Sequence, residues 1–311
     1  MSKELLGSLE LNRIYQMDCL EGMKLIPNCS IDVCISDIPY GINYDEWDIL
    51  HQNNNSALGK YHKSMDGTSF KRRGKPINGW NEKDKKIPIE YQNWCEKWIK
   101  ELFRITKEAS PIILFSSRRY LHRVCIALEN QGFLIRDIIV WEKDRSMAKA
   151  QKITNVLSKR GITNTELKNY RIGNLKPQYE PIIWAMKPYK KTLTDCVIEN
   201  KIGGFNCEND VVPSNILKFP TNKKNEFHPT QKPLELIECL IKLFSIDKNH
   251  VIIDPFMGSG TTAVAALKCG RKFIGFEIEP KYIEIANIRI EAMYNEIDDQ
   301  KILKNSGLLN S

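Results

Sequence analysis

A glycine-rich turn that could hold an anionic ligand lies near the end of the chain, where DPFMGSGTT runs from Asp254 to Thr262. Gly258 and Gly260 let the backbone turn sharply and approach a ligand closely. A helix is expected to begin at this turn, and the unpaired amides of its first residues favour a carboxylate or a phosphate. The glycine spacing differs from that of a P-loop and from GxGxxG, so the ligand need not carry a pyrophosphate.

An acidic residue, Glu277, ends the strand that is expected after this helix. In a strand–turn–helix–strand unit, an acid at this place can accept hydrogen bonds from both ribose hydroxyls. Together, the turn and the acid predict a ligand with a ribose and an anionic group. A tight turn in an ordinary α/β protein is the alternative. Glu279 is a rival to Glu277, but it directly precedes Pro280 and could instead cap the last helix.

A second constellation, Ser36-Asp37-Ile38-Pro39-Tyr40, follows the apolar run IDVCIS. Asp37 can accept a hydrogen bond from an amine, and the carbonyl of Ile38 can accept another. Pro39 fixes φ, which directs that carbonyl outward, and Tyr40 offers a ring face for stacking. These groups fit an exocyclic amino group on a planar base. The alternative is a turn that only ends a strand.

The elements that must position these groups alternate between short apolar strands and helices. This alternation predicts an α/β fold with a doubly wound, mostly parallel sheet, whose carboxyl strand ends line a ligand crevice. We expect seven strands, at 13–17, 31–36, 112–116, 134–141, 181–186, 251–254 and 272–277. We expect helices at 19–26, 90–107, 118–131, 233–245 and 261–269, and a last helix from 280.

Aromatic residues mark one face of the helix expected at 90–107. Tyr91, Trp94, Trp98, Leu102 and Ile105 recur at helical spacing. This periodicity predicts that the tryptophans belong to the core rather than to a ligand site.

The charge of the chain points to a polyanion. The formal net charge is +8, and basic residues cluster in loops that also contain aromatic rings. Such loops suit nucleic acid, although solvated surface lysines would explain part of the excess. The clusters are Lys60, Lys63, Lys71, Arg72, Arg73 and Lys75; Lys149, Lys152, Lys159 and Arg160; and Lys187, Lys190 and Lys191.

Cysteines and apolar runs bear on the compartment. The nine cysteines contain no CxxC pair, so no zinc or other metal site is expected. No run reaches the roughly 18 apolar residues of a membrane helix, and the N-terminus lacks an apolar signal core. We therefore expect a cytoplasmic protein with reduced thiols and no membrane partner.

Four motifs together resemble those of the S-adenosylmethionine-dependent amino-methyltransferases that act on DNA bases. Residues 37–40 resemble the family's catalytic Asp-Pro-Pro-Tyr, and residues 254–262 resemble its cofactor turn. HPTQKP at 228–233 and DCLEGM at 18–23 resemble two further family segments. The catalytic motif comes first, which is the circularly permuted β-group order. The resemblance covers about residues 11–48, 88–145 and 178–296, and it implies one Rossmann-like methyltransferase domain over 11–296.

The resemblance implies S-adenosylmethionine as the cofactor and assigns a role to each matching residue. Asp254, Phe256, Gly258 and Gly260 would frame the methionine end, with Ser259 and Thr261 in the same turn. Glu277 would bind the ribose, and Asp18, beside Cys19, would bind the adenine amine. His228, Thr230 and Lys232 would close the pocket at the carboxylate end, and Asp37, Ile38, Pro39 and Tyr40 would hold the flipped base. The alternatives are capping residues for His228 and Asp18 and a surface charge for Lys232.

The resemblance also implies a site-specific methyltransferase for N6 of adenine, since Asp stands at position 37. Cytosine N4, RNA or a protein glutamine are alternative substrates. A silent DNA-binding partner subunit is another alternative, supported only by Ile38 in place of the usual proline. Double-stranded DNA is the expected partner, with a homodimer and a cognate restriction endonuclease as further possibilities. We expect target recognition by 145–178 and 187–227, a basic loop at 41–89 that closes over DNA, and a frayed tail at 297–311.

Overall fold

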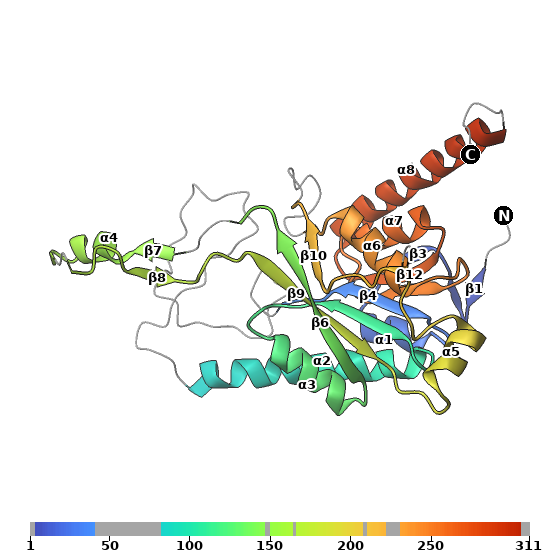
Figure 1. Cartoon of the computed structure of the whole chain (residues 1–311), viewed down its shortest axis with the longest axis horizontal. Helices are drawn as coiled ribbons and strands as arrows, with labels where there is room; N and C mark the ends of the chain where they lie inside the picture. Colours follow the sequence, from blue (N-terminus) through green and yellow to red (C-terminus); the bar gives the residue numbers. More distant parts are fainter. Residues whose placement is uncertain are drawn as a thin grey trace.

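The computed structural model describes residues 4–40, 82–146, 150–163, 166–207, 210–221 and 231–305. Its centre is an eight-stranded sheet with the order β10-β6-β9-β5-β4-β11-β12-β3 (Figure 1). The strands of this sheet are β3 (Arg13–Gln16), β4 (Val33–Asp37), β5 (Pro111–Phe115), β6 (Leu134–Lys143), β9 (Tyr179–Met186), β10 (Ile216–Phe219), β11 (Val251–Asp254) and β12 (Lys272–Glu277).

The sheet is mostly parallel, as predicted. β9 alone runs antiparallel to both of its neighbours, β5 and β6. The other neighbouring pairs are parallel. β4 and β11 are adjacent although more than 200 residues separate them, so the carboxyl ends of these two strands lie side by side at one edge of the sheet.

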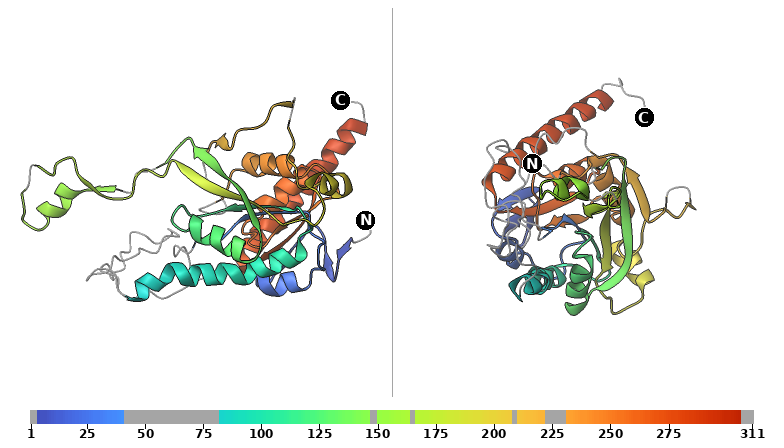
Figure 2. Two further views of the ribbon diagram at one scale, coloured as in Figure 1. Left: turned by 60° about the horizontal axis from the view of Figure 1, so that its bottom comes forward. Right: turned by 90° about the vertical axis from the view of Figure 1, so that its left-hand side faces the viewer.

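Two layers of helices cover the sheet. α6 (Leu234–Phe244), α7 (Thr261–Lys268) and α8 (Pro280–Asn305) lie on one face (Figure 2). α1 (Cys19–Lys24), α2 (Glu82–Ile105) and α3 (Leu121–Asn130) lie on the other. Alternate residues of β4 point to opposite faces, as a pleated strand requires. Val33 and Ile35 join the core beneath α6 and α7, and Cys34 joins the core beneath α2.

Smaller elements surround this body. A short hairpin near the N-terminus pairs β1 (Leu5–Leu6) with β2 (Leu9–Glu10), and α5 (Leu193–Asn200) follows β9. An arm projects from the body, built from β7 (Ala150–Lys152), α4 (Ile153–Ser158) and β8 (Arg171–Gly173), with β7 and β8 antiparallel (Figures 1 and 2). Across the described ranges, no helix combines the length and the apolar character needed to cross a bilayer.

Besides these smaller elements, which were not predicted, three details differ from the sequence prediction. β10 adds an eighth strand, whose four residues show alternating exposure at the sheet edge rather than an apolar run. α2 begins at Glu82 and continues through Pro88, so residues 82–89 belong to a helix and not to the expected loop. Residues 41–81 of that loop lie outside the described residues. α8 continues to Asn305, so most of the expected tail is helical.

Candidate active site

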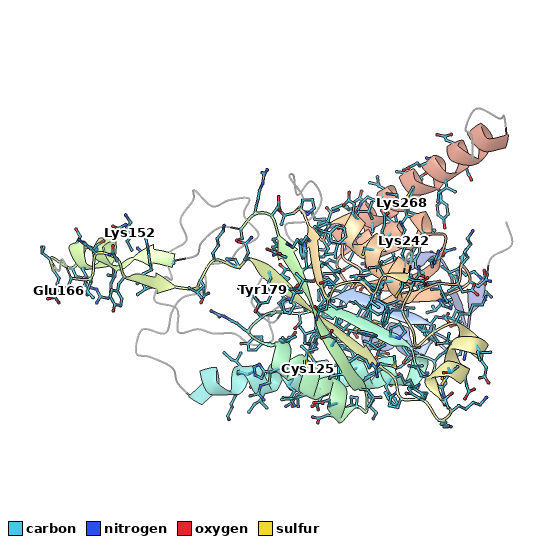
Figure 3. The ribbon with its side chains drawn as sticks, viewed as in Figure 1. Cys125, Lys152, Glu166, Tyr179, Lys242 and Lys268 are labelled. Carbon is cyan, nitrogen blue, oxygen red and sulfur yellow. The ribbon has the colours of Figure 1, made fainter. Side chains whose placement is uncertain are left out.

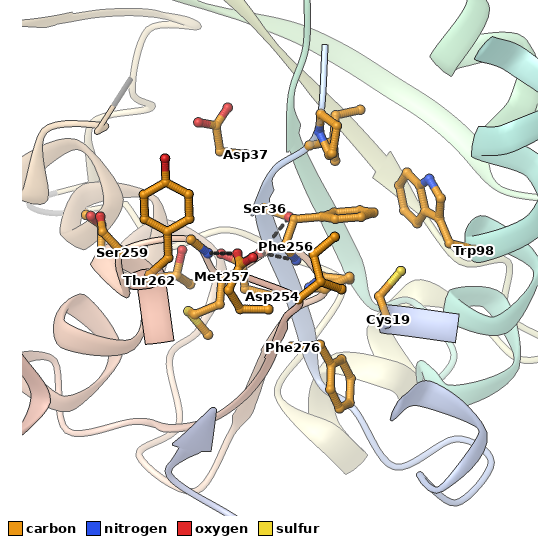
Figure 4. Close-up of a pocket in the computed structure, with 18 of the residues that line it drawn as sticks. Cys19, Ser36, Asp37, Trp98, Asp254, Phe256, Met257, Ser259, Thr262 and Phe276 are labelled. Carbon is orange, nitrogen blue, oxygen red and sulfur yellow. Dashed lines mark hydrogen bonds between the residues drawn. The ribbon is translucent and has the colours of Figure 1, made fainter. Parts of the chain in front are cut away.

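The two sequence motifs meet in one pocket. The tetrapeptide leaves the carboxyl end of β4, and the glycine turn leaves the adjacent carboxyl end of β11. The Ser36 hydroxyl donates to Asp254 Oδ1 at 2.6 Å, which joins the two strand ends directly (Figure 4). Tyr40 and Gly258 both line the pocket, as do residues from α1, α2, β12 and α8.

The two glycines of the turn have different neighbours. Both have positive φ, +53° at Gly258 and +81° at Gly260, in the region that other residues rarely adopt. A Cβ at Gly258, which lines the pocket, would meet no heavy atom within 4 Å. A Cβ at Gly260 would lie 2.8 Å from the Cβ of Ala286 on α8. Gly260 is not among the lining residues, so its geometry serves the packing of α7 against α8.

A half-buried arginine supports the turn from the side of α8. Arg289 of α8 donates through Nη1 to the carbonyl of Ser259 at 2.5 Å and lies 3.2 Å from the hydroxyls of Ser259 and Thr261. Ser259 and Thr261 line the pocket, but their hydroxyls are therefore already engaged on the α8 side. The sequence did not single out Arg289, since only the packing of α8 brings it to the turn.

Asp254 stands at the base of the pocket. The residue is 2% exposed, and burial raises the pKa of its carboxyl to about 6 against the opposing hydrogen bonds. Those bonds come from the side chains of Ser36 and Thr262 and from the amide of Phe256, which donates to Oδ1 at 3.0 Å. A bound ammonium group would favour the ionised form of this buried carboxyl.

Glu277 closes another side of the pocket. Its Oε2 accepts from the amide of Gly258 at 2.8 Å, and its Oε1 accepts from the amide of Glu279 at 2.9 Å. Burial raises the pKa of the Glu277 carboxyl above its usual range. Each carboxylate oxygen has a second lone-pair site, so Glu277 can still accept from two hydroxyls. Glu279 contributes its backbone to this arrangement and is not among the lining residues.

Asp18 and Cys19 lie at the start of α1. Asp18 Oδ1 accepts from the amide of Leu20 at 2.8 Å, so Asp18 is the N-cap of the helix. It also lines the pocket, and the capping role therefore does not exclude a ligand role. Cys19 is buried beside it, and burial, together with the charge of Asp18, raises the pKa of its thiol to about 12. This thiol is a neutral, apolar part of the wall.

An aromatic wall, formed by Trp94, Trp98 and Phe256, faces α1. Phe256 makes an edge contact with Trp98 at 5.3 Å and a tilted contact with Trp94 at 5.6 Å between ring centroids. All three rings line the pocket. The prediction that both tryptophans belong to the core is therefore incomplete: Trp98 is 1% exposed and packs in the core, but it and Trp94 also face the pocket.

Asp37 lies on the far side of the pocket, beside a buried lysine. The ammonium group of Lys232 is 2.5 Å from Asp37 Oδ2 and 3.5 Å from Glu180 Oε2. The resemblance had placed Lys232 at the carboxylate end of the cofactor, whereas the structure places its charge beside the tetrapeptide. Asp37 Oδ1 is buried and has no hydrogen-bond partner among the described residues. This oxygen can therefore accept from a ligand.

The rest of the tetrapeptide is held from several elements. The hydroxyl of Tyr40 donates to Glu180 Oε2 at 3.3 Å, and the carbonyl of Pro39 accepts from the hydroxyl of Tyr91 on α2 at 2.7 Å. Ile38 is 2% exposed, and its side chain packs in the core. An apolar core position suits isoleucine as well as proline, which explains how the substitution is accommodated.

The comparisons with known proteins agree with this geometry. A DNA methylase family model, for N6 and N4 methyltransferases, matches residues 31–288. The chain belongs to this family. The Type II methyltransferase M.HindIII of Haemophilus influenzae is 46% identical to the methylase over 280 residues, which cover 85% of this chain and 90% of that protein. M.HinfI of Haemophilus influenzae is 28% identical over 300 residues, which cover 94% of this chain and 72% of that protein.

Solved structures share the fold of the methylase. The PvuII DNA methyltransferase (cytosine-N4-specific) superposes with a TM-score of 0.56 at 18% identity, covering 91% of each chain. The M1.HpyAVI–SAM complex superposes with a TM-score of 0.54 at 23% identity, covering 89% of this chain and 98% of that one. At these identities the superpositions establish the fold and not the residue roles.

Two of the expected site residues and part of one basic cluster need separate mention. His228 and Thr230 lie outside the described residues of the methylase. Lys187, from the third basic cluster, is buried, and its ammonium group bonds the carbonyl of Thr106 at 2.6 Å. It therefore supports the fold and does not present a charge to DNA. In the parts of the chain that are described, no three potential ligands among His, Cys, Asp and Glu are grouped to hold a metal ion.

Proposed function

We propose that this DNA methyltransferase transfers a methyl group from S-adenosylmethionine to the exocyclic N6 of an adenine that is flipped out of duplex DNA. The observation that carries the proposal is Oδ1 of Asp37, which is buried and has no partner in the part of the chain that the structure describes, in the same pocket as the glycine turn. It places an acceptor for an amino group opposite a turn suited to the cofactor.

The residues of the pocket fit the cofactor. Gly258 leaves open space where a side chain would stand, and Asp254 is a buried carboxylate suited to an ammonium group. Glu277 retains acceptor sites for ribose hydroxyls. The aromatic wall offers flat apolar faces to a purine. We therefore assign the methionine end to the glycine turn, the ribose to Glu277, and the adenine to the space between Asp18 and the aromatic wall.

The cofactor supplies an electrophilic methyl group on a sulfonium sulfur, so no covalent enzyme intermediate is needed. The chain's own residues must align the amine nitrogen with that methyl, which accounts for several kcal/mol of the rate enhancement. The amino nitrogen of adenine is a weak nucleophile, because its lone pair is delocalised into the ring. Asp37 Oδ1 and the carbonyl of Ile38 would accept its two hydrogens and favour a pyramidal nitrogen.

The same acceptors stabilise the positive charge that develops on the nitrogen during attack. Asp37 then stands where it can take the departing proton. The ring of Tyr40 would stack on the base and offset part of the few kcal/mol that flipping costs.

Aspartate at position 37 supports adenine over cytosine, since family members that act on cytosine N4 often carry serine there. The intact pocket opposes the reading as a silent partner subunit.

The arm is the part of the chain that we assign to DNA contact. Between residues 150 and 176 it carries Lys152, Lys159, Arg160, Lys168, Arg171 and Lys176, and Glu166 is the only acidic residue in this stretch. Figure 3 shows Lys152 and Glu166 on the arm, well away from Lys242 and Lys268 on the body. The arm leaves the sheet after β6, at the edge of the sheet that also carries Asp37. Basic side chains on the arm would bind phosphates.

The second candidate recognition segment divides into two parts. Residues 187–207 begin where β9 ends, and the amide of Lys187 bonds the carbonyl of Ser110 before β5, at the edge of the sheet away from the pocket. β10 runs parallel to β6 and ends at Phe219 on the pocket edge. This arrangement supports a DNA role for 214–221 and for the arm, and it argues against one for 187–207. A homodimer, a cognate restriction endonuclease and a cytoplasmic location remain proposals.

The test is a nucleoside analysis. Unmethylated double-stranded DNA is incubated with the methylase and isotope-labelled cofactor, digested, and analysed by mass spectrometry. N6-methyladenine is expected, and N4-methylcytosine would overturn the assignment of the base. Asp37→Asn should lower the rate by roughly 10²–10³-fold, while Asp299→Asn, at an exposed position on α8, serves as the control. Full activity of Asp37→Asn would overturn the site.

A further inference from the structure

A chain of charged side chains leads away from Asp37 through the sheet. Asp37 bonds Lys232, and Lys232 contacts Glu180 on β9. Glu180 Oε1 in turn pairs with the ammonium group of Lys143 on β6. The hydroxyl of Tyr40 joins the same carboxylate through Oε2. Glu180 therefore contacts two neighbours of Asp37, Lys232 and Tyr40, although it is not among the residues that line the pocket.

The four ionised groups of this cluster are buried to different degrees and balance in charge. Lys232 is the most enclosed, with 6% of its side chain exposed, while Lys143 and Glu180 are 16% and 20% exposed. Two carboxylates face two ammonium groups, so no net charge is buried. Burying ions costs free energy even when they are paired. Such a cluster is weak evidence for stability, and its position beside Asp37 suggests another purpose.

We propose that Glu180 is a positioning residue for methyl transfer: it fixes Lys232 and Tyr40 beside Asp37, and Lys143 holds Glu180 in turn. The inference rests on the proposed role of Asp37. It adds a strand, β9, to the elements that build the active site, and it adds two residues that no motif marks.

The geometry explains why one carboxylate serves both partners. Oε2 of Glu180 is 3.5 Å from the ammonium nitrogen of Lys232 and accepts from the hydroxyl of Tyr40. The ammonium nitrogen also lies 5.2 Å from the centre of the Tyr40 ring. The ring that would stack on the base is therefore held at its hydroxyl by Glu180 and at its face by Lys232, which limits its tilt.

The charges around Asp37 also act on its ionisation. Burial raises the pKa of Asp37, the charge and hydrogen bond of Lys232 lower it, and the charge of Glu180 raises it. Tyr40 lies beside Asp37, and Asp254 on the neighbouring strand is the other carboxylate that interacts with it. Removing the charge of Glu180 should therefore lower the pKa of Asp37, whereas removing that of Lys232 should raise it.

Glu180→Gln separates these effects from simple packing. Glutamine keeps the shape, but its single carbonyl oxygen cannot serve both Lys232 and Lys143, because its amide group must then face an ammonium group. We expect kcat to fall roughly 10- to 100-fold, because Tyr40 and Lys232 would no longer hold the flipped adenine in line with the methyl group. The acidic limb of the pH profile of kcat should move to lower pH, and the Kd for S-adenosylmethionine should stay within about twofold of the parent value.

The matched control is Glu199→Gln, which removes the carboxylate of an exposed ion pair with Lys191 at α5, far from the pocket edge of the sheet. It should leave kcat and its pH profile unchanged. A Glu180→Gln enzyme with unchanged kcat would overturn the inference. So would a loss of kcat without movement of the acidic limb, because a purely structural role predicts that result.

Two further measurements keep the test decisive. Thermal unfolding is followed for every variant, and if Glu180→Gln does not fold, Lys143→Met carries the test, with the same expected loss of kcat at unchanged cofactor Kd. Asp37→Asn is assayed in parallel. If Asp37→Asn is active, the proposed site is wrong; if it is inactive while Glu180→Gln behaves like the parent, only the positioning role is wrong.

Discussion

Gly258 and Gly260 lie two positions apart, but the space around them differs. Gly258 borders the open space of the pocket, and Gly260 lies against Ala286 of α8. Its amide also belongs to the turn, donating to the carbonyl of Met257 at 3.0 Å. The two glycines therefore separate a requirement for ligand space from a requirement for helix packing.

This difference predicts that alanine at Gly258 mainly affects cofactor affinity, whereas alanine at Gly260 mainly affects stability. Gly258→Ala should raise the Kd for S-adenosylmethionine, because the added Cβ enters the space of the ligand. A single poor contact that costs about 1.4 kcal/mol would raise this Kd about tenfold. Gly260→Ala should instead lower the free energy of unfolding by about 1–3 kcal/mol through overpacking against α8, with little change in Kd. Isothermal titration and thermal unfolding check both variants. Equal effects on Kd would show that Gly260 also borders the cofactor.

The residues that the sequence identified are those whose role is local. Asp37, Asp254 and Glu277 each end a strand within a short motif, so their neighbours in sequence are also their neighbours in space. Glu180 and Arg289 could not be found in this way, because each reaches the site through packing between distant elements. Lys232 lies in a recognisable motif, but its contact with Asp37 depends on where α6 begins relative to β4.

At the scale of elements, α2 joins the pocket to the core. Its aromatic residues lie on one face, and Tyr91 bonds the tetrapeptide while Trp94 and Trp98 contact Phe256. Periodicity predicted the buried face correctly. It could not show that the face continues into a pocket, since core and pocket walls have the same apolar pattern.

The strands of the arm and β10 could not be predicted from the sequence. The arm lacks a long apolar run, because its β7–β8 hairpin is short and mostly exposed. β10 is recognisable only by its pairing with β6. The strands at the middle of the sheet, β4, β5 and β11, were predicted because helices cover both of their faces, which requires nearly continuous apolar sequence.

The basic charge of the arm leads to a prediction about salt. Each phosphate contact made by a lysine or arginine contributes about 0.9 to the slope of log K against log salt concentration. The double variant Lys159→Gln/Arg160→Gln should therefore weaken DNA binding and reduce that slope by up to about 1.8, because both residues are exposed on the arm. Fluorescence anisotropy with duplex DNA at several salt concentrations measures the slope.

The control for the arm lies at the opposite edge of the sheet. Lys190→Gln/Lys191→Gln removes the same charge near α5, where Lys191 already pairs with Glu199. This variant should leave the salt slope unchanged. If both double variants reduced the slope equally, DNA contact could not be assigned to the arm.

At the scale of the whole molecule, the pocket is maintained at a cost in stability. Burial raises the pKa of Asp37, Asp254 and Glu277 above their usual values. A carboxyl whose pKa is higher in the folded state favours folding when protonated and opposes it when ionised. Elsewhere, Asp247 has the opposite effect, since its hydrogen bond with Lys201 lowers its pKa to about 2. The overall pH profile therefore mixes both signs, and one group must be isolated by substitution.

Asp254 is the best group to isolate, because its pKa rises from 3.8 to about 6. Below about pH 4 the Asp254 carboxyl is protonated in both states and its burial does not oppose folding. As the pH rises through about 6, its ionisation lowers the free energy of unfolding by on the order of 3 kcal/mol at most. Asp254→Asn removes this loss and keeps an acceptor for Ser36 and for the Phe256 amide. In the absence of cofactor, its Tm relative to the parent should therefore be higher at pH 7.5 than at pH 4.5, while its affinity for S-adenosylmethionine should fall. Calorimetry at both pH values tests this, and a Tm difference independent of pH would show that Asp254 is not held in a state where ionisation opposes folding.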